Sequence, residues 1–492
     1  MGVLGTTWSL IVLIAQIGIV FCSILLAIYG LNIYILAYLS GKGKDKHHEK
    51  YKKKLERYPM VTIQLPIYNE KYVVRRLLKS VTAIDYPKDK MEIQILDDST
   101  DETVEIVQEE VASYNAQGYI IEHIRRDNRE GYKAGALQNG LKYAKGDFIT
   151  VFDADFVPHK EFLTDTLPYF FGDERIGLVQ TRWGYINQEN SPITKAVSIA
   201  YDGHFLIEQL ARNKARFFMN FNGTAGIWRR TCIEDGGGWH GDTIAEDLDL
   251  SYRAQMRGWK FLVLPDIITP SEIPPNWVAF KKQQFRWAKG SIQCFKKHSR
   301  TIMKSNAPFI KKLQSELHLS YYMVHPLMFF IMFFLVVLVV SGSSVTPLMY
   351  FAPLAIIAGL GPTYGYLVAI RRAEGLEWSK RVPHLLTLLL LGFALSVSNT
   401  VAVIQGLHKK GGTFERTPKY NLTDQEKEWK KMDYKIKDKK IFLEGLFGTY
   451  ALIGAIVAFM HFQEFWIAGF FLLLFSVAYY FSAIMTYLHG RL

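Results

Sequence analysis

Two aspartates stand one residue apart at the end of an apolar run. Asp153 and Asp155 follow residues 148–152, which are apolar or β-branched and read as a buried strand. Alternate residues of an extended chain face the same side, so we expect the two carboxylates to lie together. Ionised carboxylates repel each other unless a cation is near, and Mg²⁺ or Mn²⁺ takes carboxylate, phosphate and water oxygens. The spacing therefore predicts a metal site, with an ordinary aspartate turn as the alternative.

Polar residues also end two other runs that read as strands. The runs 60–70 and 91–103 carry Glu70 and Asp98 near their polar ends, and 177–183 is a fourth strand-like run. Helical segments separate these runs, which predicts an α/β fold with a mainly parallel sheet. Ligands of such sheets bind beyond the carboxyl ends of the strands, so we expect the acidic residues to share one site.

The segment 241–255 offers a second pair of acids, Glu246 and Asp247, at the expected start of a helix. Thr243 followed by Glu246 matches a capping box, and acids in a first turn compensate the helix dipole. That interpretation accounts for Glu246 but does not require Asp247, which is available as a general base. The segment alone does not decide between the two interpretations.

Residues 276–298 interleave Trp and Phe with Lys and Arg, which is typical of a helix lying on a membrane surface. Within this segment, Gln283, Arg286 and Trp287 bring together an amide, a guanidinium and an indole. Arginine binds diphosphates through bidentate hydrogen bonds. The indole offers a flat apolar face of the kind on which sugar rings stack. Together these groups suit a nucleotide-sugar.

Composition divides the chain of 492 residues into two kinds of region. Residues 10–38 and most of 318–488 are long apolar stretches, while 41–315 read as a soluble α/β protein. The apolar stretches predict transmembrane helices, so we expect an integral membrane protein in contact with a lipid bilayer. The net charge of +12 lies beside these stretches, which indicates orientation in a membrane and no nucleic acid partner.

Basic segments predict which side each loop takes. Lys42–Arg57 has eight Lys/Arg against three acidic residues and 408–440 has eleven against six, so both are expected in the cytoplasm, as is the basic loop 371–381. Two cytoplasmic loops cannot flank a full crossing. We therefore interpret 384–407, whose second half is polar, as an interfacial or re-entrant helix and predict five crossings. Six crossings with a basic outer loop is the alternative.

In this order, the motifs resemble processive family 2 glycosyltransferases of the cellulose synthase kind, and most closely the cellulose-synthase-like mannan and glucomannan synthases. The matching segments are "LPIYNE", "LDDSTDET", "EGYKAGAL", "FDADF", "NGTAGIWRR", "AEDLDLSYRA" and "QQFRWAKG". The resemblance covers roughly residues 55–420 and most of the membrane part. It implies an α/β GT-A glycosyltransferase domain joined to an α-helical transmembrane channel region.

The resemblance implies a role for each matching residue. The donor-binding residues would be Tyr68, Glu70, Asp98, Lys133, Asp153, Gln283 and Arg286, and the metal, Mg²⁺ or Mn²⁺, would bind Asp153 and Asp155. Asp247 would be the general base, and the acceptor would contact Trp287, Thr224 and Glu246. A gating loop would contain Phe414, Thr417, Pro418 and Lys419. Two motifs depart from the family: Asn222 stands where the cellulose group has Cys, and "AED" replaces "TED".

The expected organisation follows from the membrane pattern and the resemblance together. It comprises a first transmembrane helix (7–40), a cytoplasmic GT-A domain (41–275), amphipathic interface helices (276–317), transmembrane helices (318–371), an interfacial helix with a cytoplasmic gating loop (383–445) and C-terminal transmembrane helices (446–488). The resemblance implies a plasma membrane location, or the Golgi in a eukaryote. The sequence leaves the oligomeric state open.

The expected activity is processive, inverting transfer of a hexose from UDP-glucose or GDP-mannose to a growing β-linked polysaccharide, with translocation of the product. The main alternative is a non-processive transferase acting on a lipid acceptor such as ceramide or polyprenyl phosphate. A transporter would place ionisable residues inside its spans. His325 is the only clear one in 318–341, which weakens that alternative. A catalytically silent export scaffold would not need the acidic set.

Overall fold

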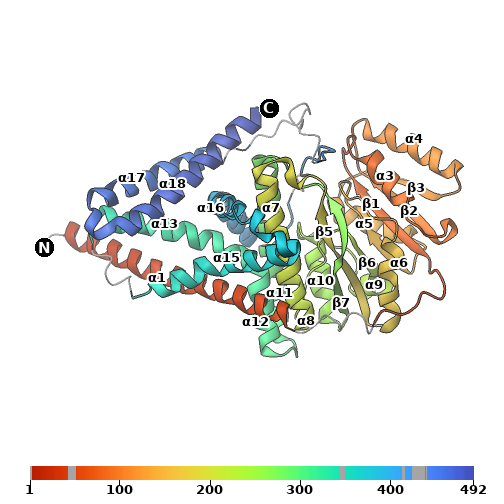
Figure 1. Cartoon of the computed structure of the whole chain (residues 1–492), viewed down its shortest axis with the longest axis horizontal. Helices are drawn as coiled ribbons and strands as arrows, with labels where there is room; N and C mark the ends of the chain where they lie inside the picture. The colour runs from red at the N-terminus through yellow and green to blue at the C-terminus, as the bar shows by residue number, and fades with distance from the viewer. Residues whose placement is uncertain are drawn as a thin grey trace.

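The protein is described by a computed structural model that covers residues 3–42, 51–343, 350–412, 416–423, 438 and 440–491. Figure 1 shows a domain built on a β-sheet at one end of the molecule and a group of long helices at the other. The first helix of the chain lies in this group, and the sheet domain is inserted after it. The predicted fold class, an α/β domain joined to an α-helical membrane region, is confirmed.

A seven-stranded sheet forms the centre of the soluble domain, with the order β3-β2-β1-β4-β6-β5-β7. The strands are β1 Val61–Ile67, β2 Met91–Asp97, β3 Ile120–Arg125, β4 Phe148–Val151, β5 Ile176–Tyr185, β6 Gly226–Arg229 and β7 Lys260–Ser271. Strands β3, β2, β1 and β4 are mutually parallel, β5 pairs parallel with β7, and β6 runs antiparallel to β4 and β5. The parallel strands β1, β2 and β4 therefore end at one edge.

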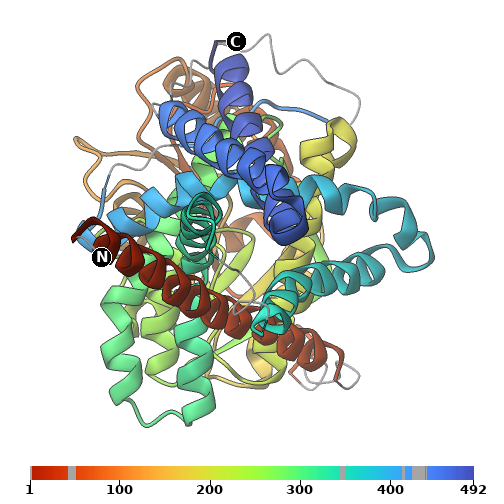
Figure 2. The same ribbon diagram turned by 90° about the vertical axis from the view of Figure 1, so that its left-hand side faces the viewer.

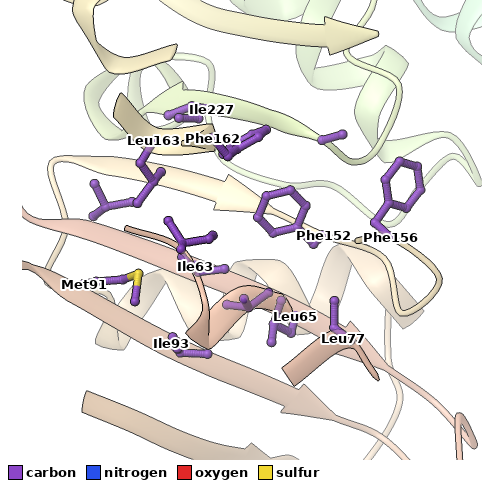
Figure 3. Packing of buried hydrophobic residues seen from close by; sticks show 14 of the residues in the cluster. Ile63, Leu65, Leu77, Met91, Ile93, Phe152, Phe156, Phe162, Leu163 and Ile227 are labelled. Atoms are coloured by element: carbon purple, nitrogen blue, oxygen red, sulfur yellow. The ribbon is translucent and has the colours of Figure 1, made fainter. Parts of the chain in front are cut away.

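Apolar side chains from neighbouring strands pack with helices on one face of the sheet (Figure 3). Ile63 of β1 and Ile93 of β2 are fully buried there, next to Leu77 and Phe162 from the covering helices. Phe152, directly after β4, packs on Phe162 with ring centroids 4.9 Å apart. This packing fixes the strand ends and the loops that follow them.

Helices surround the sheet and connect its strands. The α-helices are α3 Val74–Thr82, α4 Thr103–Ala116, α5 Tyr132–Tyr143, α6 Phe162–Thr166, α7 Pro192–Gly203, α8 Leu210–Lys214, α9 Arg230–Asp235 and α10 Glu246–Met256. A π-helix, η4 His204–Gln209, joins α7 to α8, and short 3₁₀ helices are η1 Lys88–Lys90, η2 Leu167–Gly172 and η3 Gln188–Asn190. Gly131 and Tyr132, at the start of α5, both have positive φ, 68° and 49°.

The second region is helical. It comprises α1 Val3–Gly41, α11 Trp277–Lys304, α12 Phe309–Leu319, η5 Tyr321–Met323, α13 Val324–Val340, α15 Ala352–Glu374, η6 Gly375–Arg381, α16 His384–His408, α17 Ile441–Met460 and α18 Phe462–Arg491. Within the described residues, six helices (α1, α13, α15, α16, α17 and α18) are long and apolar enough to cross a membrane. The expectation of a multi-pass membrane protein agrees with this set.

Helix α16 differs from the other apolar helices in direction and in contacts. Helix α16 is seen almost end-on in Figure 1 and from the side, in light blue, in Figure 2. Helix α13 is seen from the side in Figure 1 and almost end-on in Figure 2, so the two helices run in different directions. Before the start of α16, Arg381 Nη1 donates to Asp202 Oδ2 (2.9 Å) in α7. After its end, Gly411 N donates to the carbonyl oxygen of Asp242 (2.8 Å). Both ends of α16 are thus joined to the sheet domain.

Candidate active site

A cavity of about 170 Å³ opens at the carboxyl ends of β1, β2 and β4. Helices α10 and α11 and the segment 416–423, here called the strap, close its other sides. The predicted site residues that line it are Tyr68, Glu70, Asp98, Lys133, Asp153, Asp155, Glu246, Asp247, Gln283, Arg286, Trp287, Thr417, Pro418 and Lys419. Two are missing from this lining: Thr224 lies beneath it, and Phe414 lies outside the described residues.

The two aspartates of the "DAD" segment face the cavity for a different reason from the one predicted. Strand β4 ends at Val151, and Phe156 N donates to the carbonyl oxygen of Asp153 (3.0 Å), which closes a turn. Ala154 is buried in the core, so Asp153 and Asp155 remain on the cavity side. The strand-alternation argument was wrong, whereas the shared direction of the carboxylates was right.

Each of these aspartates is paired with a lysine. Lys133 Nζ lies 2.6 Å from Asp153 Oδ1, and Lys419 Nζ lies 2.6 Å from Asp155 Oδ1. Burial alone would raise the pKa of Asp153, but the two ammonium groups outweigh it and hold that pKa below its usual value. Lysines therefore compensate the carboxylate charge that was expected to require a metal.

The donor set nevertheless fits a hard divalent cation. Asp153 and Asp155 offer carboxylate oxygens to one cavity, which are the ligands that Mg²⁺ and Mn²⁺ prefer. Lys419, which now pairs with Asp155, belongs to the strap, a different chain segment from the aspartates. Asp153 and Asp155 are the residues that would hold the ion.

Asp247 and Glu246 occupy the first turn of α10. The helix begins at Glu246 after Ala245, which makes no side-chain capping bond, so the predicted capping box at Thr243 is wrong. Burial, reinforced by the neighbouring charge of Glu246, raises the pKa of Asp247 to about 7. The carboxylate accepts one hydrogen bond from Leu248 N (2.8 Å). A half-buried carboxylate with this pKa suits proton abstraction near neutral pH.

The loop before β6 brings the base and the lysine together. Gly223 has φ +79°, its carbonyl accepts from Lys133 Nζ (2.9 Å), and a Cβ there would lie 3.0 Å from Asp247 Oδ2. Thr224 is fully buried, and its hydroxyl accepts from Asp153 N (2.9 Å). The structure thus places Thr224 behind Asp153, a positioning role, and corrects its predicted contact with the acceptor.

Helix α11 supplies the face of the cavity nearest the membrane helices. Its start is fixed by Asn276, whose side chain accepts from Ala279 N (2.9 Å). Gln283 accepts from the hydroxyl of Tyr201 (2.6 Å), which holds its amide in place. Burial lowers the pKa of Arg286, while Asp153, Glu246 and Asp247 act in the opposite direction, so its guanidinium lies in the field of the acidic set.

Trp287 belongs to a group of aromatic rings beside the cavity. Its ring centroid lies 5.8 Å from that of Tyr201 and 6.4 Å from that of Trp183. All three residues line the cavity. This arrangement gives a ring-lined surface next to the predicted base, which suits a sugar acceptor.

The strap lies across the mouth of the cavity. Arg416 Nη1 donates to the carbonyl oxygens of Tyr68 (3.1 Å) and Asn69 and pairs with Glu70 Oε2 (3.0 Å). Further along, Glu272 at the end of β7 accepts from Tyr420 N (2.7 Å) and Leu422 N (3.3 Å). The strap is therefore closed on the sheet domain, with Lys419 held at Asp155.

The far end of the cavity carries an arginine pair. Arg126 forms a two-pronged hydrogen bond to the carboxylate of Asp98, with Nε 3.0 Å from Oδ1. Arg129 lies flat on Tyr68, with its guanidinium carbon 3.3 Å from the ring centroid. These groups follow β1, β2 and β3, on the opposite side of β1 from Asp153.

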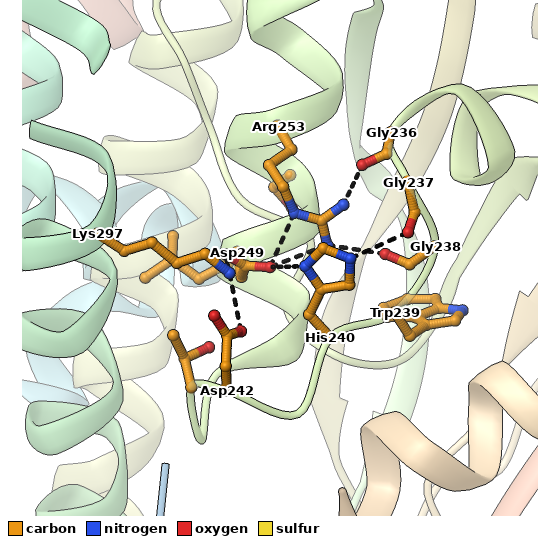
Figure 4. A network of polar contacts seen from close by, with 12 residues as sticks. Gly236, Gly237, Gly238, Trp239, His240, Asp242, Asp249, Arg253 and Lys297 are labelled. Carbon is orange, nitrogen blue, oxygen red and sulfur yellow. Dashed lines mark hydrogen bonds and ion pairs between the residues drawn. The ribbon is translucent and has the colours of Figure 1, made fainter. Parts of the chain in front are cut away.

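A second acidic cluster does not suit a metal. His240, Asp242 and Asp249 lie close enough together to hold one (Figure 4). Asp249 Oδ1, however, already faces Lys297 Nζ (2.7 Å) and His298 Nε2 (2.7 Å), and its Oδ2 faces Arg253 Nη2 (2.8 Å). These partners hold the pKa of Asp249 below its usual value and leave no net negative charge for a divalent ion.

Sequence reasoning missed several residues that line or shape the cavity. They are Arg129, Trp183, Tyr201, Gly223, Glu272 and Arg416. The "NG" pair at 222–223 was a usable signal, because Gly is the usual residue where φ is positive. Arg416 lies within the predicted gating loop, so that motif was a second signal. The remaining four reach the site through fold contacts that no local pattern predicts.

Residues 59–290 match the family model described as "Glycosyltransferase like family 2". This segment contains β1 to β7 and the first half of α11, and so includes every cavity element except the strap. Over this segment, the resemblance to family 2 glycosyltransferases drawn from the motifs is confirmed.

Curated relatives agree with the family match. The chain is 39% identical to a probable glucomannan 4-beta-mannosyltransferase 4 of Oryza sativa subsp. japonica, over 57% of this chain and 51% of the relative. It is 40% identical to glucomannan 4-beta-mannosyltransferase 1 of Cyamopsis tetragonoloba, over 59% of this chain and 56% of the relative. The matched parts thus span little more than half the length of these relatives.

One solved structure is similar over most of the chain. It is the mannosyltransferase PcManGT from Pyrobaculum calidifontis in complex with GDP-Man and Mn²⁺, with a TM-score of 0.53 and 20% identity. The likeness covers 82% of this chain and 98% of that one. At this identity the likeness concerns the fold, and it supports the predicted GT-A domain.

Proposed function

We propose that this protein is a membrane-embedded inverting mannosyltransferase that uses GDP-mannose to extend a β-linked polysaccharide. The observation that carries the proposal is a single cavity lined by a half-buried base, Asp247, together with Asp153, Asp155, Arg286 and the indole of Trp287. The names of the curated relatives support mannose over glucose as the transferred sugar.

The chemistry follows from the position of each group. Asp247 takes the proton from the acceptor hydroxyl, whose oxygen forms a bond to the anomeric carbon while the bond from that carbon to the diphosphate breaks. Negative charge then develops on the leaving diphosphate, and Arg286 and Lys133 stabilise it. Asp153 and Asp155 would hold a divalent ion, which would supply further charge stabilisation to that diphosphate. Because there is one displacement, an α-linked donor gives a β-linked product.

Acceptor binding falls to the aromatic surface. Trp287 and Tyr201 lie where α11 and α7 meet the membrane helices, so a polymer stacked there points toward the bilayer. This position favours repeated extension and translocation of a polysaccharide. Glu246, whose carboxylate lies 3.8 Å from Lys133 Nζ, lines the same cavity and is assigned to an acceptor contact.

The closed strap supports its proposed gating role. Lys419 pairs with Asp155, a proposed metal ligand, and Arg416 lies against Glu70 at the donor end. Thr417 and Pro418 line the cavity between them. In this arrangement the strap and a metal-bound donor compete for the same carboxylates, so donor entry requires the strap to move.

The contacts of α16 support five crossings and a cytoplasmic catalytic domain. Both ends of α16 are bonded to the sheet domain, and the strap that follows is bonded to the catalytic cavity. A helix whose two ends lie on one side of a membrane does not cross it. The basic segments beside the spans then place that side in the cytoplasm.

The test uses the purified full chain in detergent with Mn²⁺ and radiolabelled GDP-mannose or UDP-glucose. We expect polymer from GDP-mannose that a β-mannanase degrades, and none from Asp153→Ala, with Asp242→Asn as a matched surface control. Polymer formed from UDP-glucose but not from GDP-mannose would contradict the assignment of GDP-mannose as the donor. Product soluble in organic solvent would favour the lipid-acceptor alternative, and full turnover by Asp153→Ala would remove the metal role.

A further inference from the structure

The proposed donor has a base, a ribose and a diphosphate, and the sheet gives this molecule a direction. Asp153 follows β4, Tyr68 follows β1 and Asp98 follows β2, and these strands are neighbours in the order β2-β1-β4. Two strand spacings separate the ends of β4 and β2, about 10 Å. A diphosphate at Asp153 therefore places its base near Tyr68 and Asp98.

Arg129 occupies the ring face that a base at this position would use. Its guanidinium carbon lies 3.3 Å from the centroid of Tyr68, a separation typical of stacked planar groups. A nucleobase can stack on Tyr68 only if Arg129 moves away.

Besides Tyr68, Arg129 also contacts Tyr132, with its guanidinium carbon 5.3 Å from the ring centroid. Its buried Nε has no hydrogen-bond partner among the described residues and lies 3.9 Å from Asp98 Oδ2. By contrast, Arg126 is bound to Asp98 and to the carbonyl oxygens of Glu130 (2.9 Å) and Tyr132 (3.0 Å). Arg126 therefore fixes the loop that carries Arg129, while the Arg129 side chain is left able to turn.

We propose that Arg129 selects guanine: the entering base displaces its guanidinium from Tyr68, and the guanidinium then binds the guanine edge that carries O6 and N7. This inference rests on the proposed use of GDP-mannose. Arginine binds these two acceptors as a pair. Adenine replaces one of them by an amino donor, and uracil, like thymine, offers the single acceptor O4. Guanine is thus the base that fits the arginine fork.

The test measures dissociation constants of GDP, UDP and 7-deaza-GDP for the full chain in detergent with Mn²⁺. 7-deaza-GDP lacks the N7 acceptor. A bidentate pair discriminates by about 5- to 150-fold. We expect Arg129→Gln to raise the dissociation constant of GDP by a factor within that range and to change the dissociation constant of UDP much less. Arg129→Lys, which keeps the charge but not the fork, should behave like Arg129→Gln.

Two comparisons make the test specific. Wild-type protein should bind 7-deaza-GDP more weakly than GDP, and Arg129→Gln should no longer distinguish them. Arg75→Gln is the matched control, because Arg75 is half-exposed on α3 and pairs with Glu109 outside the cavity. Wild-type preference for GDP that survives in both Arg129 variants would overturn this inference alone. Wild-type preference for UDP would overturn the inference together with the proposed donor.

Discussion

Helix α10 carries two aspartates in opposite circumstances. Asp247, in the first turn, lines the cavity, and burial raises its pKa to about 7. Asp249, two residues later, lies against Arg253 and Lys297 (Figure 4). These two residues and His298 lower its pKa. Residues two apart on an α-helix point to nearly opposite sides, so one helix presents one carboxylate to each environment.

The difference separates a reactive carboxylate from a structural one. A buried carboxylate without a strong cationic partner holds its proton near neutral pH and can exchange it with a substrate. A buried carboxylate surrounded by cations stays ionised, and its charge contributes to folding as long as the partners remain. The same residue type in one short motif, "EDLDL", thus serves two purposes that only the tertiary partners distinguish.

The largest expected effect comes from removing the reactive carboxylate. Asp247→Asn keeps the side-chain shape but cannot accept the proton, so turnover should fall by about 10²–10⁴-fold. GDP binding should be retained, because Asp247 is assigned to the acceptor proton. Radiolabel transfer and nucleotide titration on the same preparation measure the two quantities. Near-normal transfer would remove Asp247 as the base, and Asp242→Asn controls for loss of one surface carboxylate.

A smaller effect should follow from crowding the base without removing it. Gly223→Ala places a methyl group 3.0 Å from Asp247 Oδ2 at a φ of +79° that L-residues disfavour. A displacement of the base by a fraction of an ångström should lower turnover by about 10- to 100-fold. Gly118→Ala is the matched control, since its φ is +81° and nothing lies within 4 Å of the added carbon. Equal losses in both variants would show backbone strain and not crowding of the base.

The pH dependence should follow Asp247 and not Asp249. The raised pKa of Asp247, about 7, means that the basic form is lost as the pH falls through 7, so the rate should fall about tenfold per unit below that value. Asp249 stays ionised over this range because its pKa is lowered. Rates of the wild type between pH 5 and 9 at saturating donor test this. A profile flat through pH 7 would contradict the assignment.

Sequence patterns with a local physical cause predicted many of the residues that line the site. Strand runs ending in acids predicted that Asp98 and Asp153 line one cavity, because parallel strands end at one edge of the sheet. Charge on both sides of 384–407 predicts that this helix does not cross, which stays a prediction because α16 is also long and apolar enough to span a membrane.

The rest depends on partners that are distant in the chain. Thr243 matched a capping box, yet α10 begins only at Glu246, and its first turn lines the cavity. Asp153 and Asp155 were placed by strand periodicity, whereas a turn places them. Arg129 reaches Tyr68 because Arg126 folds the intervening loop, a contact without any sequence signal.

The smallest effect on turnover should come from the structural aspartate, although its effect on folding is large. Asp249→Asn replaces a fully buried anion with an amide that presents two N–H donors to Arg253, Lys297 and His298. Leaving such cations unpaired costs about 3–5 kcal/mol of the free energy of unfolding. A lowered thermal midpoint in detergent, with turnover per folded molecule close to wild type, is the expected result.

Acid should act on the wild type in the same direction as this substitution. Because the folded-state pKa of Asp249 is lowered, its ionised carboxylate stabilises the folded state at pH values above its unfolded-state pKa, about 3.9. This stabilisation is lost as the pH falls below that value toward the folded-state pKa. The thermal midpoints of wild type and Asp249→Asn should therefore converge below pH 4. Asp242→Asn, which removes a half-exposed partner of Lys297, should change the midpoint little. A turnover loss in Asp249→Asn as large as in Asp247→Asn would show that the two faces of α10 are not separate.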